Sequence, residues 1–363
     1  MVSLYEGYKL LNTRGKVTYF AGANTGDGFV GSYADIANEG KLDKVYIIKG
    51  GPGSGKSSMM RKIAAAAEAK GKPAEYYLCG SDPGSLDCVV IDGRIAVLDG
   101  TFPHVKDMKY PGAKSAIIDI SKCWNDSTLE ERKEEIVSHS ALKSLEYSSA
   151  YRYLKAATQI ELDNIAERSA VFNQEKADGF VSRFIKKLSK PSSDQINTDH
   201  RYTAGITMQG RARVATLYDL AETKYSISDS YGCSTELIKL MYNKLSTAGY
   251  SLIVGYLPLC DTISEIYIKD AGVTISAADR GEEARIINAD RFVKKENLPQ
   301  SKGKIKLASS CREECLNAAL YCLNKAAEHH FSLEKIYIES MNFDKLNKLT
   351  EAIITEVLWR LAE

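Results

Sequence analysis

Residues 50–57 limit what this chain can fold into more than any other feature. They read Gly-Gly-Pro-Gly-Ser-Gly-Lys-Ser and fit the pattern G-x-x-x-x-G-K-[ST]. The apolar residues 45–48 before them predict a strand, and residues 58–67 after them favour a helix. Glycines let the backbone curl around an anion, and the N-terminus of the helix adds partial positive charge. This order therefore predicts a phosphate-binding loop in an α/β domain.

We expect the loop to bind a nucleoside triphosphate together with Mg²⁺. Lys56 should reach the β- and γ-phosphates, and the hydroxyl of Ser57 should be a ligand of the metal. Residues 95–98 predict a buried strand, which delivers the carboxylate of Asp99 to the metal. The alternative for Asp99 is a turn-capping role. The expected nucleotide-binding residues are Gly51, Pro52, Gly53, Ser54, Gly55, Lys56, Ser57 and Ser58.

Two further loops should open at the same edge of the sheet. They carry Asp82, Asp87 and His104, each a candidate for orienting a water molecule beside Lys56 and Asp99. A turn residue is the alternative for Asp82, and a structural histidine is the alternative for His104. Glycine follows Asp99, so a glutamate base beside the metal aspartate is missing from the sequence. The sequence contains no N-K-x-D motif for guanine, which favours ATP over GTP.

The sequence contains a weak internal repeat. Residues 19–22 (Tyr-Phe-Ala-Gly) recur as 202–205 (Tyr-Thr-Ala-Gly), and 117–119 (Ile-Ile-Asp) recur as 286–288 (Ile-Ile-Asn). The offset between matches drifts from 183 to 169 along the chain, as a duplication with small deletions would produce. Chance similarity is the alternative.

The second copy lacks the phosphate-binding residues. Residues 229–236 read Asp-Ser-Tyr-Gly-Cys-Ser-Thr-Glu, with one glycine, no lysine, and two carboxylates that would repel phosphate. The strand at 273–275 ends at Ser276, which cannot replace the metal aspartate. We therefore expect the second half to be a degenerate unit.

A long segment without helix breakers lies between the halves. It has no proline between Pro111 and Pro191 and no glycine between Gly112 and Gly179. About 60 residues are too many for one ordinary helix in a compact domain, so a helical hairpin or projecting arm is expected. The predicted divisions are 1–125 for the nucleotide-binding domain, 126–190 for the arm, and 200–363 for the degenerate repeat with C-terminal helices. The predicted fold is α/β, with a mostly parallel sheet flanked by helices.

Composition restricts the partners. The formal net charge is +1, so it gives no indication of nucleic-acid binding. No apolar run approaches the length of a membrane span, and the N-terminus lacks a signal-peptide core, so a cytoplasmic protein without membrane contact is expected. Eight cysteines without a C-x-x-C pair argue against a disulfide framework and a zinc site. A protein partner of the arm and a homo-oligomer stay open.

Three segments together resemble a poorly characterised bacterial family of tandem phosphate-loop ATPases. They are residues 50–57, residues 79–87 with Ser-Leu-Asp at the end, and residues 99–104, which read Asp-Gly-Thr-Phe-Pro-His. The resemblance covers most of the chain and implies two nucleotide-binding units, each followed by a helical segment. Both halves usually carry the lysine-containing loop in that family, and the second half of this chain departs from that pattern.

The function expected from these features is Mg²⁺-dependent binding and hydrolysis of ATP by the first half. The second half would then be a pseudo-ATPase repeat. Two alternatives stay open. One is a small-molecule or nucleotide kinase, which uses the same loop but needs an acceptor pocket and a lid. The other is a nucleotide-gated scaffold with little turnover.

Overall fold

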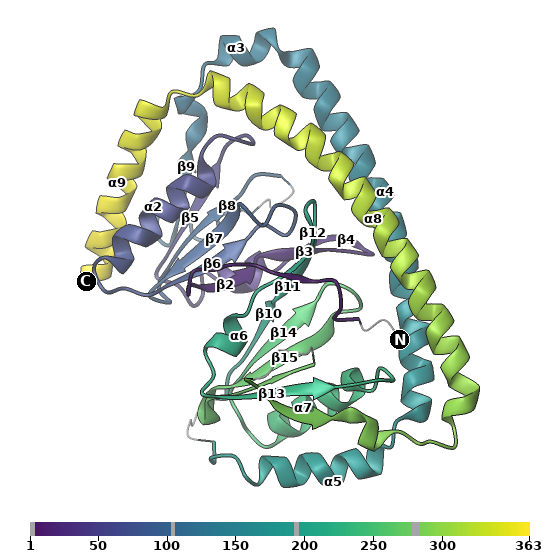
Figure 1. Cartoon of the computed structure of the whole chain (residues 1–363). Coiled ribbons are helices and arrows are strands. Elements are labelled where there is room, and N and C mark those ends of the chain that lie inside the picture. Colours follow the sequence, from purple (N-terminus) through teal and green to yellow (C-terminus); the bar gives the residue numbers. More distant parts are fainter. Residues whose placement is uncertain (1–3, 103–105, 192–195, 278–282) are drawn as a thin grey trace.

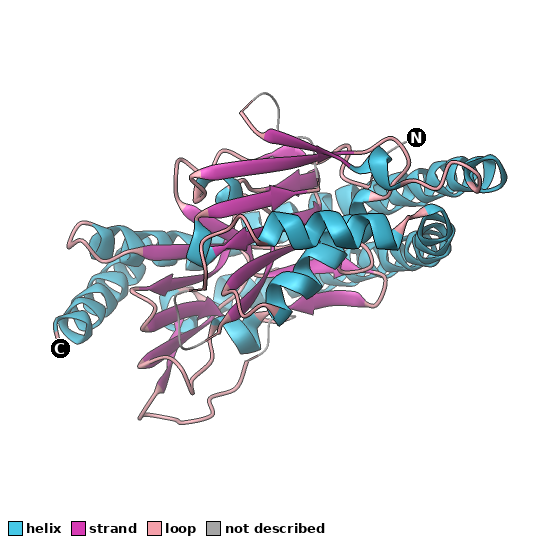
Figure 2. Ribbon diagram, turned by 90° about the horizontal axis from the view of Figure 1, so that it is seen from below, coloured by secondary structure: helices cyan, strands magenta, loops and turns pink. Residues whose placement is uncertain are grey.

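A twelve-stranded mixed sheet runs through the described part of the chain. The computed structural model describes residues 4–102, 106–191, 196–277 and 283–363. Parallel strand pairs outnumber antiparallel ones, and helices lie on either side of the sheet (Figure 2). The expected α/β class with a mostly parallel sheet is therefore confirmed.

The first half contains the strands and helices from β1 to α5. The strands are β1 (Lys9–Leu10), β2 (Val17–Phe20), β3 (Gly22–Thr25), β4 (Gly28–Gly31), β5 (Lys44–Lys49), β6 (Ala74–Leu78), β7 (Leu86–Ile91), β8 (Ile95–Asp99) and β9 (Ser115–Asp119). The helices are α1 (Tyr33–Ile36), α2 (Lys56–Glu68), the 3₁₀ turn η1 (Ile120–Cys123), α3 (Asp126–Glu131), α4 (Lys133–Val171) and α5 (Gln174–Ile185).

The second half repeats most of these elements in the same order, although β1 and α3 have no counterpart there and η2 is additional. Its strands are β10 (Thr198–Tyr202), β11 (Ala204–Thr207), β12 (Gly210–Arg213), β13 (Thr223–Ser228), β14 (Leu252–Leu257), β15 (Thr262–Ile268), β16 (Val273–Ser276) and β17 (Arg285–Asn288). Its helices are α6 (Thr216–Asp219), α7 (Ser234–Thr247), the 3₁₀ turns η2 (Lys269–Ala271) and η3 (Ala289–Phe292), α8 (Leu298–Ser340) and α9 (Phe343–Ala362).

Strand order is repeated on the two sides of the sheet centre. There β2 and β10 pair antiparallel, with Phe20 opposite Tyr202. Outward from this pair the order is β2-β6-β7-β8-β5-β9 on one side and β10-β14-β15-β16-β13-β17 on the other. Strand β5 precedes the glycine-rich residues 50–57, and strand β13 precedes residues 229–236. The two strands therefore occupy matching places, each between two parallel neighbours.

The long helices exchange between the halves. Helix α4 (39 residues) leaves the first half and packs along its length against α8 (43 residues) of the second half (Figure 1). Helix α5 then packs on α7 of the second half, and α9 packs on α2 of the first half. The segment 126–190 is thus not a hairpin closed on itself, since the buried side chains of α4, such as Leu154, lie in a core shared with the second half. The predicted boundary at residue 200 likewise does not separate the packing units.

Backbone hydrogen bonds fix both ends of this exchange in the same way. The C-terminal end of α4 meets the turn η3, and the C-terminal end of α8 meets the turn η1. Asn173 and Asn342 cap the helices that follow, α5 and α9. The bonds are Asn125 N to Ser340 O (2.9 Å), Asn342 N to Cys123 O (2.6 Å), Asn173 N to Phe292 O (2.7 Å) and Lys294 N to Val171 O (2.8 Å). The α4/α8 helix pair is therefore held at one end by the segment that follows β9 and at the other end by the segment that follows β17.

Candidate functional site

The glycine-rich segment forms a loop between β5 and α2, as the sequence predicts. Strand β5 ends at Lys49 and helix α2 begins at Lys56. Gly53 and Gly55 have φ angles of 66° and 87°, a region that favours glycine, and Gly55 is the N-cap residue of α2. The loop therefore turns the first amide groups of α2 and its own backbone toward the same edge of the sheet.

The structure brings Lys56 and Asp99 together. Strand β8 runs parallel to β5 with Asp99 opposite Ile48, so the Asp99 carboxylate lies beside the loop. Its Oδ2 is 3.5 Å from Lys56 Nζ, and its Oδ1 accepts a hydrogen bond of 2.8 Å from Thr101 N. Lys56 Nζ also donates to the carbonyl oxygens of Gly50 (3.1 Å) and Gly51 (2.6 Å). The lysine thus lies under the loop, next to a carboxylate at the end of a neighbouring strand.

The serines of the loop differ in their contacts. Ser57 Oγ accepts a hydrogen bond of 3.0 Å from the backbone N of Leu86, which leaves a lone pair for a metal ion. Ser54 Oγ donates to Gly51 O at 2.7 Å and stabilises the turn, while Ser58 is exposed on α2. A serine hydroxyl and one carboxylate suit Mg²⁺, which uses few protein ligands and takes its other oxygens from water and phosphate.

The three candidates for orienting water have different surroundings. Asp87 is buried at the start of β7, and its Oδ2 accepts a hydrogen bond of 2.9 Å from the hydroxyl of Tyr33. Burial and the charge of Asp87 raise the pKa of Tyr33 well above its ordinary value, so this hydroxyl remains a donor. Asp82 instead holds a turn, since its Oδ1 accepts from Gly84 N (3.0 Å) and from Gln209 Nε2 (2.9 Å) of the second half. His104 lies outside the described residues.

The α4/α8 helix pair adds residues that sequence reasoning missed. Helix α8 packs on the loop at Glu334, since a Cβ atom on Gly53 would lie 2.7 Å from the backbone oxygen of Glu334. The His330 imidazole, 3.5 Å from Glu334 Oε1, is the main reason that the pKa of Glu334 lies below its ordinary value. Glu334 is 278 residues from Lys56 in the chain, and only the apolar face of a long helix signals this region in the sequence.

Helices α8 and α9 also contact the backbone of the loop directly. A Cβ atom on Gly51 would lie 2.4 Å from the ring of Tyr337, and one on Gly55 would lie 2.6 Å from a methyl group of Leu346. The Tyr337 ring therefore leaves no room for a side chain at Gly51, and Gly55 combines contact with Leu346 with a φ of 87°.

The corresponding loop of the second half is closed by its own carboxylate. Asp229 Oδ1 accepts hydrogen bonds from the backbone N of Tyr231 (2.9 Å) and Gly232 (2.8 Å), and Oδ2 accepts from Ser234 N (2.7 Å). These amides occupy the places at which a phosphate-binding loop would donate to phosphate. Strand β16 ends at Ser276 and leads into Ala277, so neither residue supplies a carboxylate for a metal.

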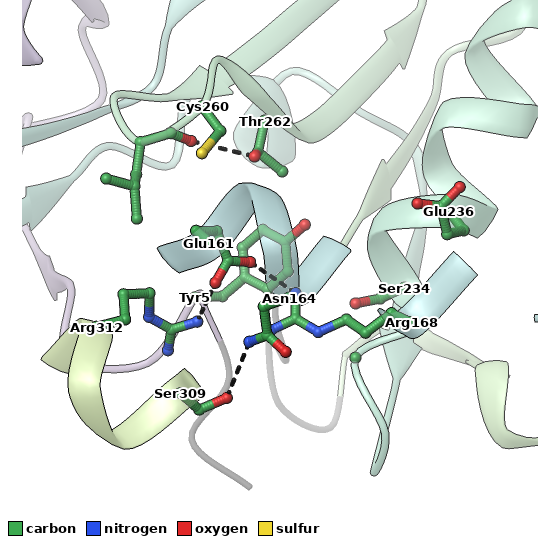
Figure 3. A network of polar contacts seen from close by, with 12 residues as sticks. Tyr5, Glu161, Asn164, Arg168, Ser234, Glu236, Cys260, Thr262, Ser309 and Arg312 are labelled. Atoms are coloured by element: carbon green, nitrogen blue, oxygen red, sulfur yellow. Dashed lines mark hydrogen bonds and ion pairs between the residues drawn. The ribbon is translucent and has the colours of Figure 1, made fainter. Parts of the chain in front are cut away.

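A buried charge network lies beside this second loop (Figure 3). Glu161 of α4 pairs with Arg168 and with Arg312 of α8, each at 2.7 Å. The guanidinium of Arg168 packs on Gly232, where an added Cβ would overlap it. The adjoining cavity of about 20 Å³ holds about one water molecule and offers no space for a nucleotide.

No protein-family profile, no curated protein sequence and no solved structure matches the chain. Among the described residues, no helix is both long and apolar enough to cross a bilayer. The same part of the chain contains no group of three or more His, Cys, Asp and Glu side chains arranged to hold a metal ion.

Proposed function

We propose that the first half binds ATP with Mg²⁺ and hydrolyses it, and that the second half is a degenerate copy of the same unit. One observation carries the proposal. A glycine-rich loop leads into α2, and the Lys56 ammonium group at the start of that helix lies 3.5 Å from Asp99 Oδ2 at the end of the neighbouring strand. This is the arrangement of an anion-binding loop next to a metal-binding carboxylate.

The loop residues have distinct roles in this proposal. Lys56 and the amides from Gly53 to Ser58 would bind the phosphate oxygens, and Ser57 and Asp99 would hold Mg²⁺. The metal ion would neutralise negative charge on the phosphate oxygens. Asp87, held by the Tyr33 hydroxyl, is the better placed of the two described carboxylate candidates for orienting water, because Asp82 is engaged in a turn.

The repeated strand order supports the proposal that the halves derive from one ancestral unit. The hydrogen bonds of Asp229 support the loss of nucleotide binding in the second half, since a phosphate would have to displace a carboxylate that is covalently part of the loop. Its remaining role would be to hold α5 and one end of the α4/α8 helix pair.

A nucleotide-gated scaffold with little turnover is the second candidate. It is favoured by the glycine that follows Asp99, where many ATPases have a glutamate base, and by the hydrogen bonds that hold Lys56 to the loop carbonyls. Such a protein would bind ATP tightly and release phosphate slowly.

Phosphate release and ATP binding by the purified chain test the proposal. Wild type should bind Mg²⁺-ATP and release phosphate, Lys56→Ala should lose both, and the exposed control Lys70→Ala should keep both. Tight binding without release would favour the scaffold, and release of ADP only with an added acceptor would favour a kinase. An unaffected Lys56→Ala variant would refute nucleotide binding at this loop.

A further inference from the structure

The β6/β7 loop (residues 79–85) connects Ser57 to parts of the molecule far from the phosphate-binding residues. The loop ends at Leu86, whose backbone N donates a hydrogen bond of 3.0 Å to Ser57 Oγ. Arg61 Nη2 of α2 donates to Gly84 O at 3.0 Å, which ties the loop to the same helix. A hydroxyl oxygen has two lone pairs, so the hydrogen bond from Leu86 leaves one for a metal ion and sets its direction.

A buried amide side chain holds the β6/β7 loop in place. Asn24 of β3 is fully buried, and its Nδ2 donates to Gly80 O (3.3 Å) in the loop and to Ile206 O (2.8 Å) on β11 of the second half. Its Oδ1 accepts a hydrogen bond of 3.1 Å from the hydroxyl of Tyr151 on α4. Any other orientation of Asn24 would leave a buried polar group without a partner, which is costly. Asn24 therefore ties the loop to the second half and to α4.

The β11/β12 hairpin of the second half reaches the same loop. At its tip Met208 N donates to Ser81 O (2.8 Å), and Gln209 Nε2 donates to Asp82 Oδ1 (2.9 Å). Met208 is buried, whereas Gln209 is exposed. The same Asp82 oxygen accepts from Gly84 N (3.0 Å) within the loop. The hairpin therefore supports the turn on which the conformation of the loop depends.

The corresponding hairpin of the first half, β3/β4, has a similar tip but a different contact. Asp27 and Gln209 occupy equivalent places, since the backbone N of each donates to the Oγ1 of a threonine two residues earlier (3.2 and 3.1 Å). The β3/β4 tip packs instead on α4, where a Cβ atom on Gly26 would lie 2.9 Å from Lys155 Cα, and Asp27 is exposed. Asp27 is therefore a matched control for Gln209.

On the basis of the proposed function, we propose that the second half positions a Mg²⁺ ligand of the first half. Its β11/β12 hairpin, together with Asn24, holds the β6/β7 loop, and the loop sets the direction of the Ser57 hydroxyl through Leu86 N. Asn24 and Gln209 are positioning residues, since each acts through the loop and not on the metal ion itself. The half that lacks phosphate-binding residues thus contributes to the metal site of the half that has them.

Calorimetric titration with ATP at a series of free Mg²⁺ concentrations tests the inference. The quantity compared is the free Mg²⁺ concentration at which the gain in ATP affinity is half complete. Asn24→Ala should raise it about tenfold, as is typical when a residue that orients a metal ligand is removed. Gln209→Ala should raise it about threefold, because one exposed hydrogen bond is lost. Gln209→Glu should raise it further, because its carboxylate would face Asp82. Asp27→Ala should leave it unchanged.

Titration with ATP in EDTA separates positioning of the metal ligand from general damage to the site. Binding of metal-free ATP should be unchanged in the Asn24 and Gln209 variants, because Lys56 and the loop amides bind phosphate without the metal. An equal loss of affinity with and without Mg²⁺ would overturn the inference. If Asn24→Ala does not fold, the two variants of the exposed Gln209 decide the question.

Ser57→Ala distinguishes failure of this inference from failure of the proposed function. If Ser57→Ala raises the Mg²⁺ requirement while Asn24→Ala and Gln209→Glu titrate as wild type does, the second half does not position the ligand and the proposed metal site stands. If Ser57→Ala titrates as wild type does, Ser57 is not a metal ligand and the inference fails with it. If wild type binds no ATP, both proposals fail.

Discussion

Asp229 offers a quantitative test of how the second loop is closed. Its carboxylate accepts three backbone hydrogen bonds of 2.7–2.9 Å, and Asp229→Ala would leave all three amides without that acceptor. The amides of Tyr231 and Gly232 are in partly exposed residues, so water can replace the carboxylate there, but Ser234 is buried. An unsatisfied buried donor costs about 1–3 kcal/mol, so the free energy of unfolding should fall by about 2–3 kcal/mol.

Urea unfolding followed by circular dichroism measures this loss. The exposed control Asp219→Ala should change stability by less than about 0.5 kcal/mol. Inorganic phosphate should restabilise Asp229→Ala more than wild type, because the freed amides and the N-terminus of α7 can then bind an anion. A loss below about 0.5 kcal/mol, or an equal response of both proteins to phosphate, would show that Asp229 does not take the place of phosphate in this loop.

Three further outcomes are expected. Arg312→Met should lower the free energy of unfolding in urea by about 3 kcal/mol, because the buried Glu161 loses one of its two cations; a loss under about 1 kcal/mol would contradict this. Asp99→Asn should make ATP binding in calorimetry insensitive to EDTA, whereas wild-type binding should weaken when Mg²⁺ is chelated. Hydrogen bonds from Ser121 lower the pKa of Asp119 in the folded protein. The ionised carboxylate therefore stabilises the fold above about pH 4, the ordinary pKa of an aspartate in an unfolded chain. This stabilisation is lost as the pH falls through the pKa of the folded state. Asp119→Asn should therefore flatten the stability profile below about pH 4 in acid titration, and an unchanged profile would refute this role.

Local sequence patterns were sufficient for the elements around the first loop. Residues 45–48 lie in β5, residues 58–67 lie in α2, and residues 95–99 form β8. These elements follow from short apolar runs, glycines and helix-favouring residues that are adjacent in the chain. The placement of Asp99 beside Lys56 followed in turn, because the carboxyl ends of parallel strands meet at one edge of a sheet.

The exchange of helices could not be predicted from those patterns. Apolar positions on α4 and α8 show that each helix needs a partner, but periodicity does not identify which one. The choice depends on contacts such as Glu161 with Arg312, which lie 151 residues apart. Glu334 was missed for the same reason, since it lies in no motif and reaches the loop only through the packing of the long helices.

The closed state of the second loop was predicted only in part. The sequence showed one glycine and no lysine, and it indicated that Asp229 would repel phosphate. It did not reveal that this carboxylate turns back onto the amides of its own loop, because that depends on local backbone angles such as the φ of 85° at Gly232.

The most direct measurement is a structure of the chain with Mg²⁺ and a non-hydrolysable ATP analogue. We expect one bound analogue, with its phosphates on the amides of residues 53–58 and on Lys56, and with the metal ion on Ser57 and Asp99. An analogue seated on the loop at residues 229–234, or no bound analogue at millimolar concentration, would contradict the central claim.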